Sequence, residues 1–211
     1  MQDPVAFLEG ALGLRLWEGQ KAIVRSVQAS RRTAVKSGHN VGKTFIAAAI
    51  VLEFLYANRG SKVVTTATTW SQVENLLWSE IRKIHAQAPF RLGPPPLQTK
   101  IEIEPGWHAV GMSTKDPSSF QGTHSGRILI VFDEAQGIPS PIWDAAETMM
   151  SSHGARWLAI GNPISPSGRF HEAFQRQREW NCITLPCLAH PNVVEGQLVY
   201  IDAVTKEWVE E

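Results

Sequence analysis

The sequence predicts a single α/β domain in which helices flank a mostly parallel sheet. Segments typical of strands alternate with segments typical of helices along the chain. Residues 127–132 form an unbroken apolar run, as expected of a strand buried on both faces. The composition supplies a sizeable core, because 43% of the 211 residues are hydrophobic and 19% are charged. This length fits one domain, since a domain usually takes about 100–200 residues.

Each element is expected from its own local pattern. Strand segments are short, apolar or β-branched, and helical segments repeat apolar residues at a period near 3.6. The expected strands cover residues 33–36, 62–66, 99–104, 108–112, 127–132 and 155–160. The expected helices cover residues 43–57, 70–86, 142–150 and 169–178. The proline-rich segment 89–96 must be a loop. Because parallel sheets bind ligands beyond the carboxyl ends of their strands, we expect the site there.

Charge and cysteine content exclude several classes of protein. Lys plus Arg and Asp plus Glu number 20 each, so the net charge gives no general argument for nucleic acid or an anionic membrane. Cys182 and Cys187 form neither a disulfide framework nor a CxxC zinc motif, which fits a reducing compartment. The longest apolar run, residues 45–52, is far shorter than the roughly 20 residues of a membrane span. The start lacks the cationic region of a signal peptide, so we expect a soluble intracellular protein.

The strongest local signal is the segment Lys36-Ser37-Gly38-His39-Asn40-Val41-Gly42-Lys43-Thr44, between an expected strand and an expected helix. It resembles the P-loop, or Walker A motif, although Ser37 occupies the usual first glycine position and Gly38 follows it. Small residues let backbone N–H groups point at phosphate oxygens, and a helix start favours an anion. Lys43 would contact the β- and γ-phosphates and the Thr44 hydroxyl would bind Mg²⁺. The alternative is ordinary turn chemistry at a helix start.

A second signal is the strand Ile128-Leu129-Ile130-Val131-Phe132-Asp133-Glu134, which ends in two acids. It resembles a Walker B motif. Asp133 would hold Mg²⁺ alongside Thr44, and Glu134 would orient and deprotonate the attacking water. The alternative is that two acidic residues simply begin a surface loop.

About 90 residues separate Lys43 from Asp133, which leaves room for another strand and helix between the motifs. This spacing indicates the P-loop NTPases that have an additional strand and a catalytic Glu, a class that includes motors and helicases. In that class a polar residue at the end of the next strand senses the γ-phosphate, and Asn162 stands at that place. An Asn before Pro163 is also ordinary turn material.

Trp17 and Gln20 precede the first expected strand. A Gln amide can pair with an adenine edge and a nearby aromatic side chain can cover the base. We therefore expect residues 1–30 to form an adenine-binding region. The alternative is that Gln20 is a solvated helix residue.

Taken in order, these segments, with residues 65–73 and Gly161-Asn162-Pro163, resemble the ATPase domain of phage terminase large subunits over most of the chain. The resemblance implies an enzyme that binds ATP and Mg²⁺ and pumps double-stranded viral DNA into an empty capsid. It assigns adenine recognition to Gln20, phosphate and metal binding to Lys43 and Thr44, metal binding to Asp133, water activation to Glu134, and coupling of hydrolysis to movement to Asn162.

The resemblance also implies partners. They are the portal, on which the subunits form a ring, and the small terminase subunit, in the host cytoplasm; in isolation we expect a monomer. Many relatives have an Arg in the phosphate loop where this chain has His39. A neighbouring subunit would then supply the missing positive charge. Arg127 is the candidate and Arg91 a weaker one, although either fits an ordinary solvated arginine.

Relatives continue into a metal-dependent nuclease domain, whereas this chain ends at Glu211. We expect a single ATPase domain over residues 1–211, in which residues 195–211 begin a linker and a helix opens near residue 205. No nuclease activity is expected from this chain alone. Six basic residues and one acidic residue lie between Arg15 and Lys36, including Arg31-Arg32, and could face DNA phosphates. Such a run also fits a solvated face; DNA contact would be independent of sequence.

Two other functions fit the same motifs. A helicase or related translocase shares the phosphate loop and the acidic pair, but 211 residues leave no room for the second lobe of a two-lobed helicase. A non-catalytic nucleotide-binding module would use the nucleotide only for assembly. Glu134 discriminates between turnover and mere binding, because a module without hydrolysis has no use for it.

Overall fold

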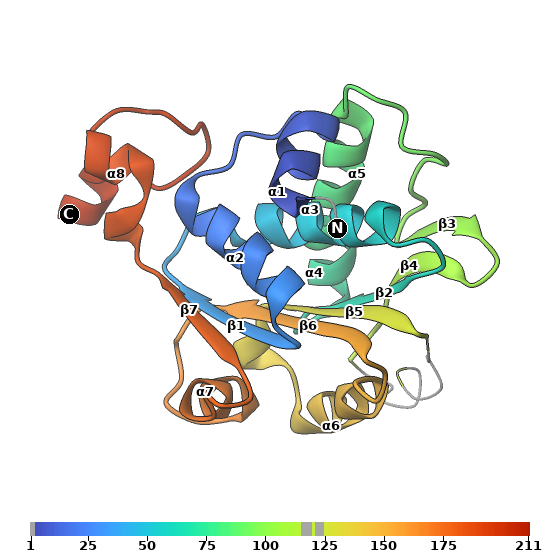
Figure 1. Ribbon diagram of the computed structural model, residues 1–211. Coiled ribbons are helices and arrows are strands. Elements are labelled where there is room, and N and C mark those ends of the chain that lie inside the picture. The colour runs from blue at the N-terminus through green and yellow to red at the C-terminus, as the bar shows by residue number, and fades with distance from the viewer. Residues whose placement is uncertain (1–2, 115–119, 121–124) are drawn as a thin grey trace.

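A seven-stranded sheet forms the middle layer of the protein, with helices on both faces (Figure 1). The structure is a computed structural model that describes residues 3–114, 120 and 125–211. The strand order is β3-β4-β2-β5-β6-β1-β7, and β3 and β4 alone among these strands pair antiparallel. The expected fold, a mostly parallel sheet flanked by helices, is confirmed.

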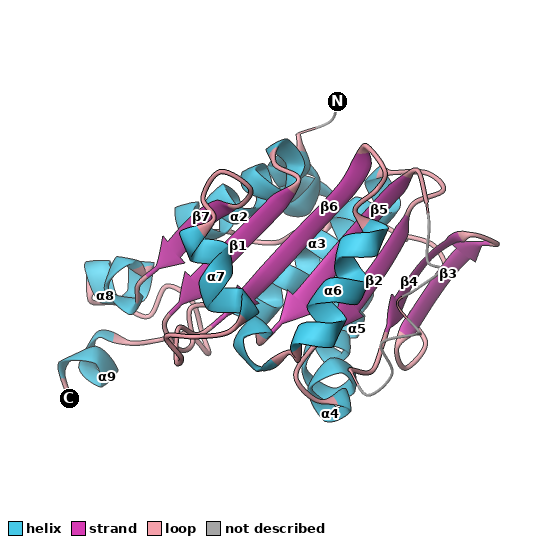
Figure 2. Cartoon of the chain, turned by 90° about the horizontal axis from the view of Figure 1, so that it is seen from below, coloured by secondary structure: helices cyan, strands magenta, loops and turns pink. Residues whose placement is uncertain are grey.

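The strands are five to eight residues long and lie side by side in the sheet (Figure 2). They are β1 Arg32–Ser37, β2 Lys62–Thr66, β3 Lys100–Glu104, β4 Trp107–Gly111, β5 Arg127–Asp133, β6 Gly154–Gly161 and β7 Asn181–Leu185. Each expected strand is present within two residues of its expected bounds. The edge strand β7 was not expected from the sequence. It is half-exposed and mixes polar with apolar residues, so it lacks the apolar run that marks β5.

Helices α2, α3 and α5 lie on one face of the sheet, and α6 and α7 lie on the other (Figure 1). The α-helices are α1 Pro4–Ala6, α2 Glu18–Ala29, α3 Lys43–Ala57, α4 Trp70–Gln72, α5 Trp78–Gln87, α6 Ser140–Met149, α7 Arg169–Gln175, α8 Pro191–Glu195 and α9 Lys206–Glu210. A π-helical turn, Val73–Leu77, joins α4 to α5, so the expected helix over 70–86 is one helical segment with a π-helical turn inside it. Helix α7 ends three residues before the expected boundary.

Strand β6 lies between β1 and β5, the two strands that precede the candidate phosphate loop and the acidic pair. The additional strand of the predicted class is therefore present. It follows both motifs in sequence, whereas the residues between the motifs form β2 and the β3–β4 hairpin on the far side of β5. The expectation that the residues between the motifs supply the additional strand is thus wrong, because β6 comes after both motifs.

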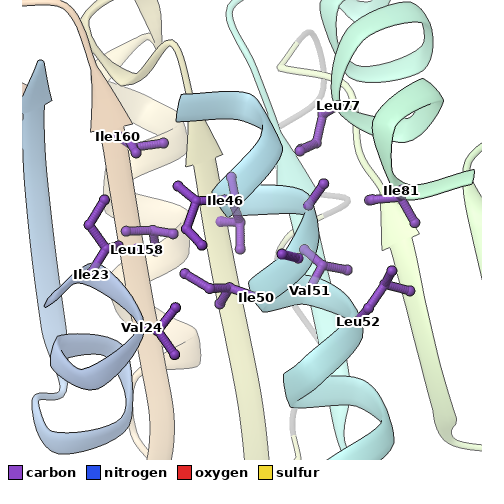
Figure 3. Packing of buried hydrophobic residues seen from close by; sticks show 14 of the residues in the cluster. Ile23, Val24, Ile46, Ile50, Val51, Leu52, Leu77, Ile81, Leu158 and Ile160 are labelled. Atoms are coloured by element: carbon purple, nitrogen blue, oxygen red, sulfur yellow. The ribbon is translucent and has the colours of Figure 1, made fainter. Parts of the chain in front are cut away.

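Helix α3 is the centre of the main hydrophobic core (Figure 3). Its residues Ile46, Ile50, Val51 and Leu52 are buried and point in different directions around the helix axis. They meet side chains from α2, β6 and the segment that leads into α5. A helix that is apolar on all sides must be buried on all sides, and this burial fixes where its first turn lies. No helix among the described residues is both long and apolar enough to cross a membrane.

A second hollow, of about 500 Å³, lies at the other end of α3, where β5 and β6 begin. Glu53 lines it together with Arg127, His153 and Arg156. Burial raises the pKa of the Glu53 carboxyl from 4.5 to about 7. Because the folded state holds this proton more tightly than the unfolded state, the contribution of Glu53 to stability is fully present below pH 4.5 and is lost as the pH rises through about 7.

We predict that Glu53→Gln removes this pH dependence. A pKa raised from 4.5 to about 7 lowers stability by about 3 kcal/mol once both states are ionised. Glu53→Gln should therefore increase the free energy of unfolding by about 2 kcal/mol more at pH 8 than at pH 5, measured by urea denaturation. The exposed carboxylate variant Glu179→Gln serves as the control. An equal effect of Glu53→Gln at both pH values would contradict the prediction.

Candidate nucleotide-binding site

A cavity of about 600 Å³ opens at the carboxyl ends of the central strands. Residues 39–45 line it, and so do Glu134, which follows β5, and Asn162, which follows β6. Three segments that are far apart in sequence therefore share one cavity, at the edge of the sheet where the sequence predicts the site.

The candidate phosphate loop runs from the end of β1 at Ser37 to the start of α3 at Lys43. Gly42 has a φ of 82°, a left-handed conformation that favours glycine, and a Cβ there would lie 2.6 Å from Gln20 Nε2. At Gly38 a Cβ would lie 2.2 Å from the free thiol of Cys187. A Cβ at position 38 would require the Cys187 side chain to move, so glycine fits well one position after Ser37, which is itself the buried last residue of β1.

Lys43 is held by two acceptors. Its Nζ donates to Asn162 Oδ1 at 2.7 Å and to the Gly38 carbonyl at 3.3 Å. Both side chains are largely buried, with 8% of Lys43 and 9% of Asn162 exposed. The amide Nδ2 of Asn162 lies 3.4 Å from Nδ1 of His39. The ammonium that would bind phosphate is therefore connected through one amide to the imidazole of the same loop.

Thr44 and Asp133 bring two oxygen ligands together. The Thr44 hydroxyl donates to Asp133 Oδ2 at 3.0 Å, and the Glu134 backbone N–H donates to Asp133 Oδ1 at 3.1 Å. Burial, with a smaller contribution from the Glu134 charge, raises the pKa of Asp133 to about 6, against the opposing effects of the Thr44 bond and Lys43. Hard oxygen donors of this kind suit Mg²⁺, which usually takes few protein ligands beside phosphate and water. Across the described residues, His, Cys, Asp and Glu form no cluster of three.

Glu134 lines the cavity in a left-handed backbone conformation, with φ at 49°. Its carboxylate accepts a hydrogen bond from Gln136 Nε2 at 2.6 Å, and its carbonyl accepts one from Thr68 Oγ1 at 3.0 Å. A non-glycine residue in this region costs about 1 kcal/mol or more and persists only where neighbours fix it. Thr68 and Gln136 are these neighbours, and neither was singled out as a site residue in the sequence.

Trp17 and Gln20 also line the cavity, and both are buried. Gln20 Oε1 accepts the Trp17 backbone N–H at 3.4 Å, and Gln20 Nε2 lies 3.5 Å from the Gly42 carbonyl. The view of Gln20 as a solvated helix residue is wrong, because only 4% of it is exposed. Its amide ties the entry of α2 to the phosphate loop, and adenine recognition by this residue remains a prediction.

One wall of the cavity, formed mainly by the C-terminal part of the chain, was not predicted from the sequence. Arg15, His190 and residues 200–203 line it, and the Val204 backbone N–H donates to the Asn40 carbonyl at 2.9 Å. Residues 195–211 were expected to begin a linker. Within them, residues 200–204 contact the cavity and the phosphate loop, and no sequence motif marks this contact. The helix expected near residue 205 is present as α9.

Arg127 begins β5, whereas Asp133 ends it. Six residues of strand separate their Cα atoms by about 20 Å, so Arg127 lies at the opposite edge of the sheet from the cavity of its own chain. Much of the Gly/Ser-rich segment before it falls outside the described residues. Arg91 is exposed and does not line the cavity. A role for either arginine in a neighbouring chain remains a prediction.

At least three of the six basic residues between Arg15 and Lys36 have partners within the chain. Arg31 donates to the carbonyls of Met150 and Ser152. Arg32 pairs with Glu147 at 2.6 Å, and Lys21 pairs with Glu9 at 3.0 Å. These intramolecular partners are not apparent from the linear sequence, and contact of this segment with DNA remains a prediction.

Comparisons with known proteins show which proteins this chain is similar to. No family model matches the chain. In sequence it is 24% identical over 173 residues to a probable terminase large subunit of Enterobacteria phage P7, a match that covers 76% of this chain and 34% of that protein. The chain therefore spans about a third of the length of this relative.

Solved structures show the same fold. The large terminase ATPase domain of Thermus phage P74-26 superposes with a TM-score of 0.72 at 20% identity, covering 96% of this chain and 95% of that one. A large terminase from a thermophilic bacteriophage gives a TM-score of 0.68 at 16% identity, over 82% of this chain and 46% of that one. That terminase has also been solved with ADP and with ATP-γ-S. The predicted resemblance to phage large terminases is confirmed, and the chain shares the fold of their ATPase domains.

We predict that Lys43 and Asn162 are energetically coupled when no nucleotide is present. Asn162→Leu leaves a buried ammonium with one acceptor fewer and should cost about 1–3 kcal/mol of unfolding free energy. In Lys43→Met/Asn162→Leu the unpaired charge is gone, so the double variant should lose about 1–2 kcal/mol less than the sum of the single variants. Denaturant unfolding of all four proteins measures this difference. Simple additivity would show that the two side chains do not interact.

Proposed function

We propose that this chain, which has the fold of large terminase ATPase domains, hydrolyses ATP and so powers the movement of double-stranded viral DNA into an empty capsid. The observation that supports hydrolysis is the meeting, in one cavity, of Lys43, the Thr44–Asp133 pair and Glu134. The likeness to phage large terminases supports the coupling of that hydrolysis to DNA packaging.

Each residue has a distinct task in this proposal. The N–H groups of residues 38–44 and the Lys43 ammonium bind the β- and γ-phosphates at the start of α3. Thr44 and Asp133 would hold Mg²⁺, which supplies charge neutralisation of the phosphates when bound. Glu134 accepts the proton of the attacking water, because its carboxylate lines the same cavity and is fixed by Gln136. When phosphate binds, Lys43 leaves Asn162 for the phosphate oxygens, and Asn162 loses this hydrogen bond. The end of β6 thereby responds to whether phosphate is bound.

The partners belong to the proposal as well. By likeness to large terminases, the chain would assemble as a ring on the portal and meet the small terminase subunit and DNA in the host cytoplasm. DNA contact would rest on phosphates and weaken steeply with salt. Alone, the chain would be a monomeric ATPase domain over residues 1–211 without nuclease activity.

Two alternatives share parts of this site. Another nucleic-acid translocase would use the same loop and acidic pair on a different substrate. A nucleotide-binding assembly module would need the loop but not Glu134. The strained and doubly anchored conformation of Glu134 favours turnover over simple binding.

We predict that the purified chain releases phosphate from ATP in the presence of Mg²⁺. Lys43→Ala should abolish nucleotide binding. Glu134→Gln should retain binding but slow turnover at least about a hundredfold, because it keeps the side-chain shape and loses the base. A phosphate-release assay with parallel equilibrium binding separates these effects, and EDTA should stop turnover.

Glu179→Gln is the matched control, because it makes the same chemical change at an exposed surface position. If the wild-type chain releases no phosphate alone, the assay is repeated with double-stranded DNA and at high protein concentration. A monomer would lack the arginine that a neighbouring chain supplies. Wild-type turnover that survives Glu134→Gln would refute the assignment of the base.

We also predict complementation between two inactive variants if Arg127 acts on the site of a neighbouring chain. Lys43→Ala has no working site but keeps Arg127, and Arg127→Ala keeps its own phosphate loop. A mixture should regain activity above either protein alone, because Arg127 of one chain can reach the intact site of the other. Arg91→Ala in place of Arg127→Ala tests the weaker candidate. Activity of Arg127→Ala equal to that of the wild type would exclude Arg127.

A further inference from the structure

The end of the cavity away from the phosphate loop is built by a row of aromatic side chains. The ring centroids of Trp17 and His190 are 5.4 Å apart, and those of His190 and Tyr200 are 5.6 Å apart, each pair edge to face. The guanidinium carbon of Arg15 lies 5.3 Å from the centroid of the Tyr200 ring. All four side chains line the same cavity as Lys43. The row begins at the buried indole of Trp17 and ends at the half-exposed ring of Tyr200, over which the Arg15 guanidinium lies.

The position of Tyr200 is fixed from two directions. Asn192 is 2% exposed, and its Oδ1 accepts the backbone N–H groups of Val199 and Tyr200 at 2.9 and 2.8 Å. Its Nδ2 donates to the Tyr200 carbonyl at 2.8 Å. Four residues later, the Val204 N–H is bonded to the Asn40 carbonyl of the phosphate loop. The aromatic wall therefore has a defined place relative to the phosphates.

The other flat groups of the cavity are already engaged. Trp17 and His190 are 7% and 1% exposed, and the Gln20 amide is directed at backbone atoms of its own chain. Phe45 and Tyr200 are both partly buried against the main core, but Tyr200 has the Arg15 guanidinium over its ring, and His39 belongs to the phosphate loop beside Asn162. Arg15 and Tyr200 thus form a cation–aromatic surface in the described lining of the cavity, on which a base can stack.

We infer that the base of the bound nucleotide stacks on the wall formed by Arg15 and Tyr200, and that Asn192 positions this wall. This inference rests on the proposed function, because it assumes that the phosphate loop binds the triphosphate. A planar cation on an aromatic ring attracts the π-face of any base, and the larger face of a purine gains more. The wall should therefore favour purine over pyrimidine triphosphates.

The test compares a ligand that has a base with one that has none. Binding of ATP and of inorganic tripolyphosphate, each with Mg²⁺, is measured by titration calorimetry. Tyr200→Ala should weaken ATP binding about tenfold or more and change tripolyphosphate binding by less than about twofold. Tyr200→Phe keeps the ring and should bind ATP like the wild type. Arg15→Ala offers a second, independent variant should Tyr200→Ala fail to fold, and Asn192→Ala should reproduce the selective loss of ATP affinity.

The outcomes separate this inference from the proposed function. If Lys43→Ala loses both ligands while Tyr200→Ala and Arg15→Ala bind ATP normally, the phosphate site stands and the base-binding wall is overturned. Equal weakening of both ligands by Tyr200→Ala and Arg15→Ala would also overturn it, because the segment would then only support the loop. A wild type that binds neither ligand would overturn both.

Discussion

The candidate site depends on the parallel pairing of β6 with β1 on one side and β5 on the other. In this register Ile160 lies opposite both Val35 and Asp133. The three strands therefore end at the same level, and the chain leaves β1 into the phosphate loop, β5 into Glu134 and β6 into Asn162. A shift of one residue would turn alternate side chains to the other face of the sheet and separate these groups. The buried apolar faces of β5 and β6 enforce the register, since such a shift would exchange their two packed surfaces.

The same arrangement explains how the site tolerates a buried charge. Leaving an ammonium without partners in a low-dielectric interior costs several kcal/mol. Asn162 and the Gly38 carbonyl supply partners to Lys43, while Thr44 and a backbone N–H do so for Asp133. In the proposed function, an incoming phosphate would replace some of these bonds. Phosphate binding and the end of β6 would then be linked by an exchange of hydrogen bonds at Lys43 and Asn162.

The sequence was most informative where local pattern and tertiary burial agree. The bounds of α3 and β2 were predicted as observed, because an all-round apolar helix and a β-branched run admit few other structures. Strand β7 and the contact of residues 200–204 with the phosphate loop were not predictable. They depend on single pairings, such as Val204 with Asn40, that leave no periodic trace. The closeness of Cys187 to Gly38 is another tertiary contact that the linear sequence does not show.

The central claim is that Lys43, Asp133 and Glu134 surround one metal-bound triphosphate. The most direct measurement is a crystal structure of the chain with Mg²⁺ and a slowly hydrolysed ATP analogue. The triphosphate should lie along residues 38–44, with the Lys43 amine moved from Asn162 to phosphate oxygens and the metal beside Thr44 and Asp133. A nucleotide bound elsewhere, or a Lys43 that stays on Asn162 while the ligand is present, would contradict this assignment.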